Sequence, residues 1–268
     1  MPTSPQIMGI VNLTPDSFSD GGRLNDVEAA LAHMESLLEA GAHVLDLGAE
    51  STRPGAQKLS DAEEWQRLGP VLEAARTRFP QAVLSIDTYH PATAQRALDV
   101  GANWINDVSG AANPQMAEII AKHLHCHYVF MHALSVPADP AQTLPETCDP
   151  VMEIAEWCKQ RILRLQEAGV DTKQLIADPG IGFGKTAAQS IQLLRRAGEM
   201  VTACPVPLLI GHSRKSFLAE AGARHASDRD VETHVISAHL AGVGVAYLRV
   251  HDVAGTRKAL AAQQLLMD

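Results

Sequence analysis

The sequence has few aromatic residues, no long apolar run, no paired cysteines and no excess of basic residues. Its four cysteines lie far apart without a C-x-x-C pair, so reduced thiols in a cytoplasmic protein are the simplest interpretation. No stretch approaches the roughly 18 consecutive apolar residues of a membrane span, and no basic region precedes an apolar stretch at the N-terminus. We therefore expect neither membrane insertion nor secretion. The formal net charge of −9 argues against sequence-independent binding of nucleic acid, but it permits a small anionic ligand in a local basic pocket.

The chain does contain enough apolar material for a core, since hydrophobic residues make up 46% of its 268 positions. The aromatic share is 4%. Parallel barrels fill their interiors with Val, Ile, Leu and Ala, so this low share is compatible with such a fold.

Eight short apolar runs are each followed by a polar or glycine-rich loop. In order, they read GIVN before LTPDSFSDGG, VLDLG before AESTRPG, LSID before T, WIND before VSG, YVFMH before a long loop, LIAD before PGIGFGK, LLIG before HSRKS and LRVH before D. Segments with helical periodicity separate these runs, which predicts βαβ units. We therefore predict the α/β class and a single (β/α)8 TIM-barrel domain over residues 1–268, with its site at the C-terminal ends of parallel strands.

Capping signals mark the first two predicted helices. Asn25 with Glu28 resembles a capping box and Gly41 ends the first helix, while Ser60 with Glu63 repeats the signal for the second. Pro70 is expected to bend that second helix. Later helices are predicted at residues 91–100, 114–122, 150–168, 188–202, 227–241 and 253–266.

Two motifs resemble other kinds of site. GIGFGKT is similar to a phosphate-binding P-loop, but that pattern requires glycine where the chain has Pro179. His123, His125 and His127 alternate as metal-binding pairs do, yet they are expected at the start of a strand, on the stability face of a barrel. Solvated or hydrogen-bonded imidazoles are the better interpretation there, and His132 at the other end of the strand is a better site candidate.

Acidic residues end several predicted strands: Asp46, Asp87, Asp107 and Asp178. Any one of them could form a structural ion pair. Four such acids, with Asn12 and Asn106 beside them, exceed what structure alone needs, because unpaired buried carboxylates are costly. A ligand rich in N–H donors would satisfy them.

The same rim carries side chains suited to an anion: Arg53, Lys185, Arg214, Lys215, Arg249 and His251, with Ser51, Thr52, Ser213 and Ser216. One face of the barrel would thus pair a carboxylate-lined pocket for a heterocycle with a cationic shelf for a phosphorylated group.

The motifs GIVNLTPDSFSDGG, DLGAESTRPG, SIDT, INDVSG, DPGIGFGK, GHSRKS and RVHD occur in the order and spacing of the dihydropteroate synthase family. This resemblance covers about residues 8–253. It implies condensation of 6-hydroxymethyl-7,8-dihydropterin pyrophosphate with 4-aminobenzoate to give 7,8-dihydropteroate and pyrophosphate. It also implies Mg²⁺ as cofactor, a homodimer, a cytoplasmic location and sensitivity to sulfonamides, which mimic aminobenzoate.

The resemblance also implies roles for individual residues. The pterin would be bound by Asp87, Asn106, Asp178 and Lys215, with Met131, Phe183, Gly211 and Arg249 around its ring. Asn12 would hold Mg²⁺, and Ser51 or Thr52, Arg249 and His251 would hold the pyrophosphate. Loops bearing Asp20 and Arg53 would close over it, and Phe18, Pro54, Phe183, Lys215 and Ser216 would line the aminobenzoate site. Catalytic roles fall on Asp87, Asp178, Lys215, Asp20 and Arg53.

The sequence departs from the family pattern in two places. Residues 131–140 read MHALSVPADP in place of M-H-M-[RQ]-G-x-P, which affects the loop at the pterin mouth, and the helix before the last strand lacks the usual small-residue run. A pterin-dependent methyltransferase is an alternative, but such proteins lack the TPDSFSDGG and SRKS motifs. A non-catalytic paralogue that binds pterin or phosphate is a second alternative.

Overall fold

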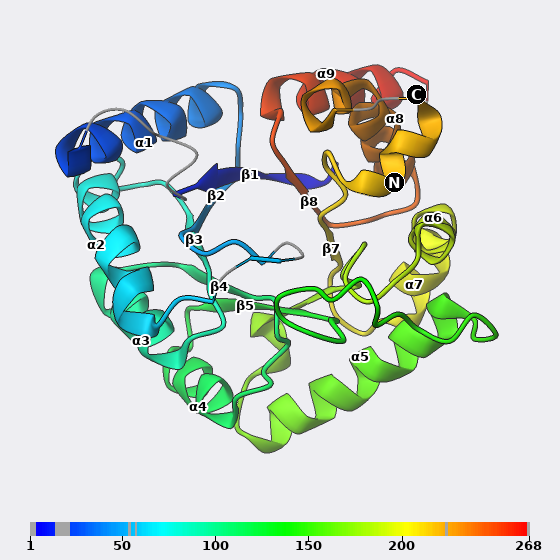
Figure 1. Cartoon of the computed structure of the whole chain (residues 1–268), viewed down its shortest axis with the longest axis horizontal. Coiled ribbons are helices and arrows are strands. Elements are labelled where there is room, and N and C mark those ends of the chain that lie inside the picture. Colours follow the sequence, from blue (N-terminus) through cyan, green and yellow to red (C-terminus); the bar gives the residue numbers. More distant parts are fainter. Residues whose placement is uncertain (1–3, 14–21, 53–54, 57, 223–224, 267–268) are drawn as a thin grey trace.

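The computed structural model describes residues 4–13, 22–52, 55–56, 58–222 and 225–266. Within them, eight parallel strands form one sheet whose order follows the sequence around the barrel, β6-β5-β4-β3-β2-β1-β8-β7 (Figure 1). The strands are β1 (Gln6–Asn12), β2 (Val44–Gly48), β3 (Leu84–Asp87), β4 (Trp104–Asp107), β5 (His127–Met131), β6 (Leu175–Asp178), β7 (Leu209–Ile210) and β8 (Tyr247–Val250).

Helices connect the strands and surround them on the outside (Figure 1). The α-helices are α1 (Gly22–Glu39), α2 (Asp61–Arg78), α3 (Pro91–Val100), α4 (Pro114–Lys122), α5 (Pro150–Glu167), α6 (Ala187–Arg195), α7 (Ala197–Ala203), α8 (Asp230–Gly242) and α9 (Val253–Gln264). Short 3₁₀ turns are η2 (Thr172–Gln174), η3 (Ser216–Ala221) and η4 (Ala226–Asp228). No helix in the described ranges has the length and apolar character needed to cross a membrane.

The barrel closes at two seams. β1 pairs in parallel with β2 on one side and with β8 on the other, which joins the two ends of the chain. β6 and β7 meet through a single parallel bridge between Ala177 and Leu208, and the Ala177 amide donates to the Pro207 carbonyl at 2.9 Å. The predicted TIM barrel is therefore confirmed, with its weakest pairing between β6 and β7.

The ends of the helices agree with some of the capping signals in the sequence and differ from others. Ser60 and Glu63 form the reciprocal capping box predicted for α2. The predicted cap at Asn25 is wrong, because α1 already begins at Gly22; a Glu three residues after Asn is equally compatible with a helix interior. The predicted helix 188–202 is divided at Arg196, whose φ of −104° and ψ of 22° end α6 and begin α7.

Side chains inside the barrel form an apolar layer separate from the larger core between strands and helices. The inner layer consists of Met8, Val44, Trp104, Val129, Ile176 and Leu209. The Trp104 indole is 4% exposed and meets the Tyr247 ring edge-on, with centroids 5.1 Å apart. One large ring therefore fills space that smaller residues fill in most such barrels.

We expect Trp104→Ala to lower the free energy of unfolding by roughly 3–5 kcal/mol, because the interior cannot collapse around a lost indole. Leu124→Ala is the control, since Leu124 is 70% exposed and its truncation should change that free energy by less than about 0.5 kcal/mol. Denaturant titration measures both; similar losses in the two variants would contradict this view of the interior.

Candidate active site

Polar residues line the barrel interior one layer above the apolar residues. Successive strand residues face opposite sides of a sheet, so a residue two positions after an inward-facing one also faces inward. Val44 is followed in this way by Asp46, Trp104 by Asn106 and Ile176 by Asp178. Because all eight strands run in the same direction, these polar side chains converge at the carboxyl end of the barrel.

The guanidinium of Arg249 connects two of the strand-end acids. Its Nε donates to Asp46 Oδ2 at 2.6 Å, and its Nη2 donates to Asp87 Oδ2 at 2.7 Å. Asp46 is fully buried and also accepts hydrogen bonds from Ser85 Oγ at 2.6 Å and Asn106 Nδ2 at 3.0 Å. The Asn106 amide is thereby oriented, with its nitrogen on Asp46 and its oxygen left as the acceptor for other groups.

The charge states around Arg249 follow from burial and pairing. Burial raises the pKa of Asp87 to about 7, although the Arg249 guanidinium opposes this shift and the Asp46 carboxylate adds to it. Burial lowers the pKa of Arg249, but the carboxylates of Asp46 and Asp87 outweigh it and hold that pKa above its ordinary value. The cation is therefore permanent, and Asp87 is the member of the group that can titrate near neutrality.

Two further charged side chains, Asp178 at the end of β6 and Lys215 after β7, lie across the barrel mouth and influence each other's pKa. Asp178 Oδ1 accepts from the Gly180 amide at 2.7 Å, and burial raises the pKa of Asp178 against the opposing effect of Lys215. Lys215 Nζ donates to the Ile181 carbonyl and lies 4.8 Å from the centre of the Phe183 ring. Burial lowers the pKa of Lys215 to about 8, and Asp178 opposes this shift.

Gly211 leaves room between these two groups of charged side chains. A Cβ at this position would lie 3.8 Å from Arg249 side-chain carbons and 3.9 Å from Asp178 Oδ2. Any larger side chain at position 211 would extend into the space that separates the two groups. The absence of a side chain therefore keeps the polar layer open to a ligand.

The rim contains fewer available cations than the sequence suggested. Arg214 makes a two-pronged contact with Asp230, at 2.7 and 2.8 Å. Lys185 Nζ is buried between His132 Nδ1 at 2.9 Å and the Phe183 carbonyl at 2.8 Å, and burial lowers its pKa to about 7. Both were expected to hold an anion, but neighbouring groups of the protein already occupy them.

Ser213 and His251 remain on the rim and contact each other. Ser213 Oγ lies 2.9 Å from His251 Nδ1, and the His251 amide donates to Ser213 Oγ at 3.2 Å. Ser213 comes two positions after Gly211, and His251 comes two positions after Arg249. They therefore lie directly above the polar layer, as expected for groups that hold a phosphorylated substituent.

The structure brings many of the predicted site residues to one end of the barrel. Asp87, Asn106, Asp178, Lys215 and Arg249 form the polar layer, with Met131, Phe183 and Gly211 beside them and Asn12, Thr52, Ser216 and His251 on the rim. Four predicted residues, Phe18, Asp20, Arg53 and Pro54, lie outside the described residues.

Asp46 belongs to this polar layer; the sequence marks it as a strand-end acid but gives it no specific role. The inward direction of its side chain is predictable from its position two residues after the inward-facing Val44. The same offset separates Ile176 from Asp178. Ser85 shows the same offset, two residues after Val83.

Asp107 differs from the other strand-end acids because its carboxylate is used within the fold. It accepts from the Ser109 amide at 2.8 Å, the Ala111 amide at 3.0 Å and the Tyr128 hydroxyl at 2.6 Å. It follows Asn106 directly, so it faces the opposite side of the strand. Its role is to shape the loop after β4.

The histidine alternation was wrongly placed on one strand. His123 ends α4, where its Nδ1 lies 2.8 Å from the Ile119 carbonyl, and His125 lies in the connecting turn. Only His127 belongs to β5, packed against Trp104. The three imidazoles form no metal-binding group, as far as the described side chains show.

Comparison with known proteins agrees with this geometry. Residues 8–251 match the family described as pterin binding enzyme. Dihydropteroate synthase of Neisseria meningitidis serogroup C is 41% identical over 268 residues, a match that covers 98% of this chain and 93% of that protein. The chain belongs to the dihydropteroate synthase family. The resemblance seen in the motifs is thus confirmed.

Other relatives of the family extend the comparison. A solved structure of Xanthomonas albilineans dihydropteroate synthase with 4-aminobenzoic acid has a TM-score of 0.90 and 39% identity, covering 98% of this chain and 93% of that one. A folate synthesis bifunctional protein of Chlamydia muridarum is 42% identical over 264 residues. That match covers 96% of this chain and 58% of the bifunctional protein, so the chain spans about three fifths of that relative's length.

The loop that departs from the family pattern contacts a neighbouring loop of the site. The Ala138 amide donates to the Thr52 carbonyl at 3.2 Å, and the Asp139 amide donates to Ser135 Oγ at 2.9 Å. Residues 131–140 thus lie against the loop after β2. Despite its unusual sequence, this loop is joined to the loop after β2 by the hydrogen bond from Ala138 to Thr52.

We expect Arg249→Met to lower the free energy of unfolding by roughly 3–5 kcal/mol at pH 8, because it leaves Asp46 and Asp87 buried without their cation. Asp87, whose pKa burial already raises to about 7, would lose the cation that opposes this shift, so its pKa would lie still further above that of the unfolded chain. The variant should therefore regain stability as the pH falls below about 7, and lose it as the pH rises.

Denaturant titrations at pH 8 and pH 5.5 measure this effect. Adding Asp87→Asn to Arg249→Met should restore part of the lost stability at pH 8, because one unpaired carboxylate is removed. A loss that is equal at both pH values and unchanged in the double variant would show that the ion pairs are not its cause.

Proposed function

We propose that this chain condenses 6-hydroxymethyl-7,8-dihydropterin pyrophosphate with 4-aminobenzoate, giving 7,8-dihydropteroate and pyrophosphate. The observation that carries this proposal is the convergence of Asp87, Asn106, Asp178 and Lys215 on one polar layer at the barrel mouth. The Xanthomonas relative, whose structure holds 4-aminobenzoic acid, supports the choice of amine.

The pterin would be recognised by groups whose hydrogen-bonding roles are already set. Asp178 uses Oδ1 on the Gly180 amide, so Oδ2 can accept from a ligand N–H. Asn106 uses its nitrogen on Asp46, so its oxygen can accept a second ligand proton. Lys215 supplies the donor for a ring oxygen or nitrogen. Acceptors and donors of this kind match the edge of a pterin, which carries N–H groups beside a carbonyl.

The same residues can assist departure of the leaving group. As the bond between the pterin methylene and the pyrophosphate oxygen breaks, positive charge develops on the methylene and spreads into the ring. In their ionised forms, the carboxylates of Asp87 and Asp178 lie beside that charge and stabilise the transition state without reorganisation. The arylamine nitrogen then forms the new bond and loses a proton, and it is nucleophilic enough to need no strong base.

The rim would hold the pyrophosphate. Ser213 and His251 lie together above the polar layer, and Thr52 lies on the adjoining loop. Asn12 fits a role as one Mg²⁺ ligand, because its side-chain oxygen is a hard donor at the exposed end of β1. Mg²⁺, when bound, would neutralise charge on the departing pyrophosphate. The roles of Asp20, Arg53, Phe18 and Pro54 in loop closure and amine binding belong to the proposal and lie outside the described residues.

The assembly and compartment are also part of the proposal. Val231 and Val235 lie one helical turn apart on α8 and are 71% and 66% exposed. Such a pair on an outer helix supports a homodimer through the C-terminal half of the chain. The four cysteines are free thiols, which supports a cytoplasmic location.

We expect the purified protein to release pyrophosphate only when both Mg²⁺ and 4-aminobenzoate are supplied, with dihydropteroate formed in equal amount. A coupled phosphate assay with chromatography of the pterin product measures both. Release at the same rate without the amine would identify a hydrolase instead.

We expect Asp178→Asn to weaken pterin binding by roughly 2–5 kcal/mol, because the amide places donors against the ligand's own donors. Asp99→Asn makes the same chemical change on the exposed face of α3 and should leave affinity unchanged. Calorimetric titration with the pterin measures both variants. Affinity within about twofold of the original protein for Asp178→Asn would exclude the assignment of Asp178.

A further inference from the structure

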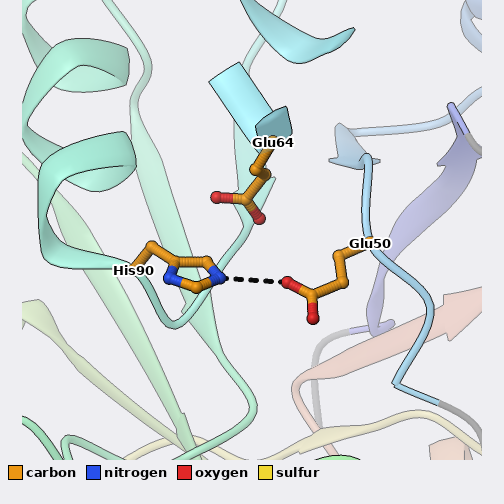
Figure 2. A group of neighbouring side chains, drawn as sticks. All are labelled: Glu50, Glu64 and His90. Atoms are coloured by element: carbon orange, nitrogen blue, oxygen red, sulfur yellow. Dashed lines mark hydrogen bonds and ion pairs between the residues drawn. The ribbon is translucent and has the colours of Figure 1, made fainter. Parts of the chain in front are cut away.

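Glu50, Glu64 and His90 come together outside the site described above (Figure 2). Glu50 lies in the loop after β2, Glu64 in the first turn of α2, and His90 immediately before α3. One ligand atom from each lies within 4.8 Å of the other two. No other group of three acidic, histidine or cysteine side chains in the described ranges meets this condition.

In this cluster Glu64 is buried and Glu50 and His90 are half-buried, so two carboxyl groups share a poorly hydrated space with one imidazole. Glu64 is 1% exposed, and the Glu50 side chain is 3% exposed. Burial raises the pKa of Glu64, and the nearby Glu50 carboxylate adds to that shift. Neither glutamate forms an ion pair with a lysine or arginine of the described chain, and the nearest basic side chain is His90, whose Nε2 lies 3.0 Å from Glu50 Oε2. A divalent ion would balance both carboxylates.

The three side chains are held toward one another by neighbouring groups. Glu50 Oε1 accepts from the Tyr89 hydroxyl at 2.6 Å and the Leu59 amide at 3.2 Å. Glu64 Oε2 accepts from the Thr88 hydroxyl at 2.8 Å. His90 occupies the cap position of α3 but makes no capping bond with its side chain, and its ring faces Glu50 instead. Hydrogen bonds from neighbouring groups orient the ligands of metal ions in this way, and a carboxylate oxygen retains lone pairs after accepting one bond.

We propose that Glu50, Glu64 and His90 bind one divalent first-row transition-metal ion of the Zn²⁺ type, which joins the loops after β2 and β3 to the start of α2. One imidazole nitrogen with two carboxylate oxygens suits Zn²⁺ better than Mg²⁺, which prefers oxygen ligands and keeps its water. The site is separate from the Mg²⁺ role proposed for Asn12. Its consequence is a fixed start for the loop that carries Ser51 and Thr52.

The test is calorimetric titration of the chelator-treated full chain with Zn²⁺, alongside three variants. We expect one ion per chain and at least a tenfold loss of affinity in both His90→Gln and Glu64→Gln, the second of which preserves side-chain shape. His125→Gln is the matched control, because His125 is exposed and outside the cluster, and it should bind as the original protein does. The midpoint of thermal unfolding should rise by about 5 °C at a free Zn²⁺ concentration 100 times Kd.

Anomalous diffraction at the zinc edge from a Zn²⁺-soaked crystal locates the ion. A peak between the three side chains supports the proposal, whereas a peak only at other histidines overturns it. Equal Zn²⁺ affinity in the original protein, His90→Gln and Glu64→Gln also overturns it. Because none of these measurements uses turnover, their outcome is independent of whether the chain condenses a pterin with an amine.

Discussion

The ion pairs from Arg249 to Asp46 and Asp87 are the interaction on which the site depends. The parallel strands β2 and β3 bring two carboxylates into the same buried layer, where like charges repel and desolvation is costly, and β8 brings Arg249 beside them. One guanidinium, with separate N–H groups at 2.6 and 2.7 Å from the two acids, makes that arrangement tolerable. Asp46 in turn orients Asn106, so the position of this neutral amide depends on the same cation.

The alternation of side chains along each strand separates stability from chemistry within the barrel. Trp104 and its neighbours form an apolar layer, and the residues two positions later form the polar layer above it. The lower layer supplies burial without hydrogen bonding, while the upper layer supplies charge in a poorly hydrated space, where electrostatic effects are strong. Gly211 lies between the two sides of this upper layer, where a larger side chain would extend toward Arg249 and Asp178.

Contacts between the loops that follow different strands extend this order to the rim. The Ala138 amide meets the Thr52 carbonyl, Tyr89 meets Glu50, and Lys185 meets His132. Each contact joins loops that follow different strands. Lys185 was expected to hold an anion. It contacts His132 instead, and so joins the loop after β6 to the loop after β5. Hydrogen bonds between loops therefore determine the structure of the rim.

The sequence alone determined the barrel, the ends of most helices and the strand-end position of the main site residues, because period and loop chemistry are local properties. It also placed Asp46 among the strand-end acids, and the two-residue offset from Val44 predicts that this side chain faces inward. Only the tertiary structure decided how charges are paired. Asp107 and Asp178 look alike in sequence, yet Tyr128 and two loop amides saturate the first, whereas the second keeps an oxygen for a ligand. Arg214 and Lys215 are adjacent in the sequence. Arg214 donates to the Asp230 carboxylate, whereas Lys215 lies buried at the barrel mouth near Asp178. These differences arise from contacts between residues distant in the chain, which local patterns do not encode.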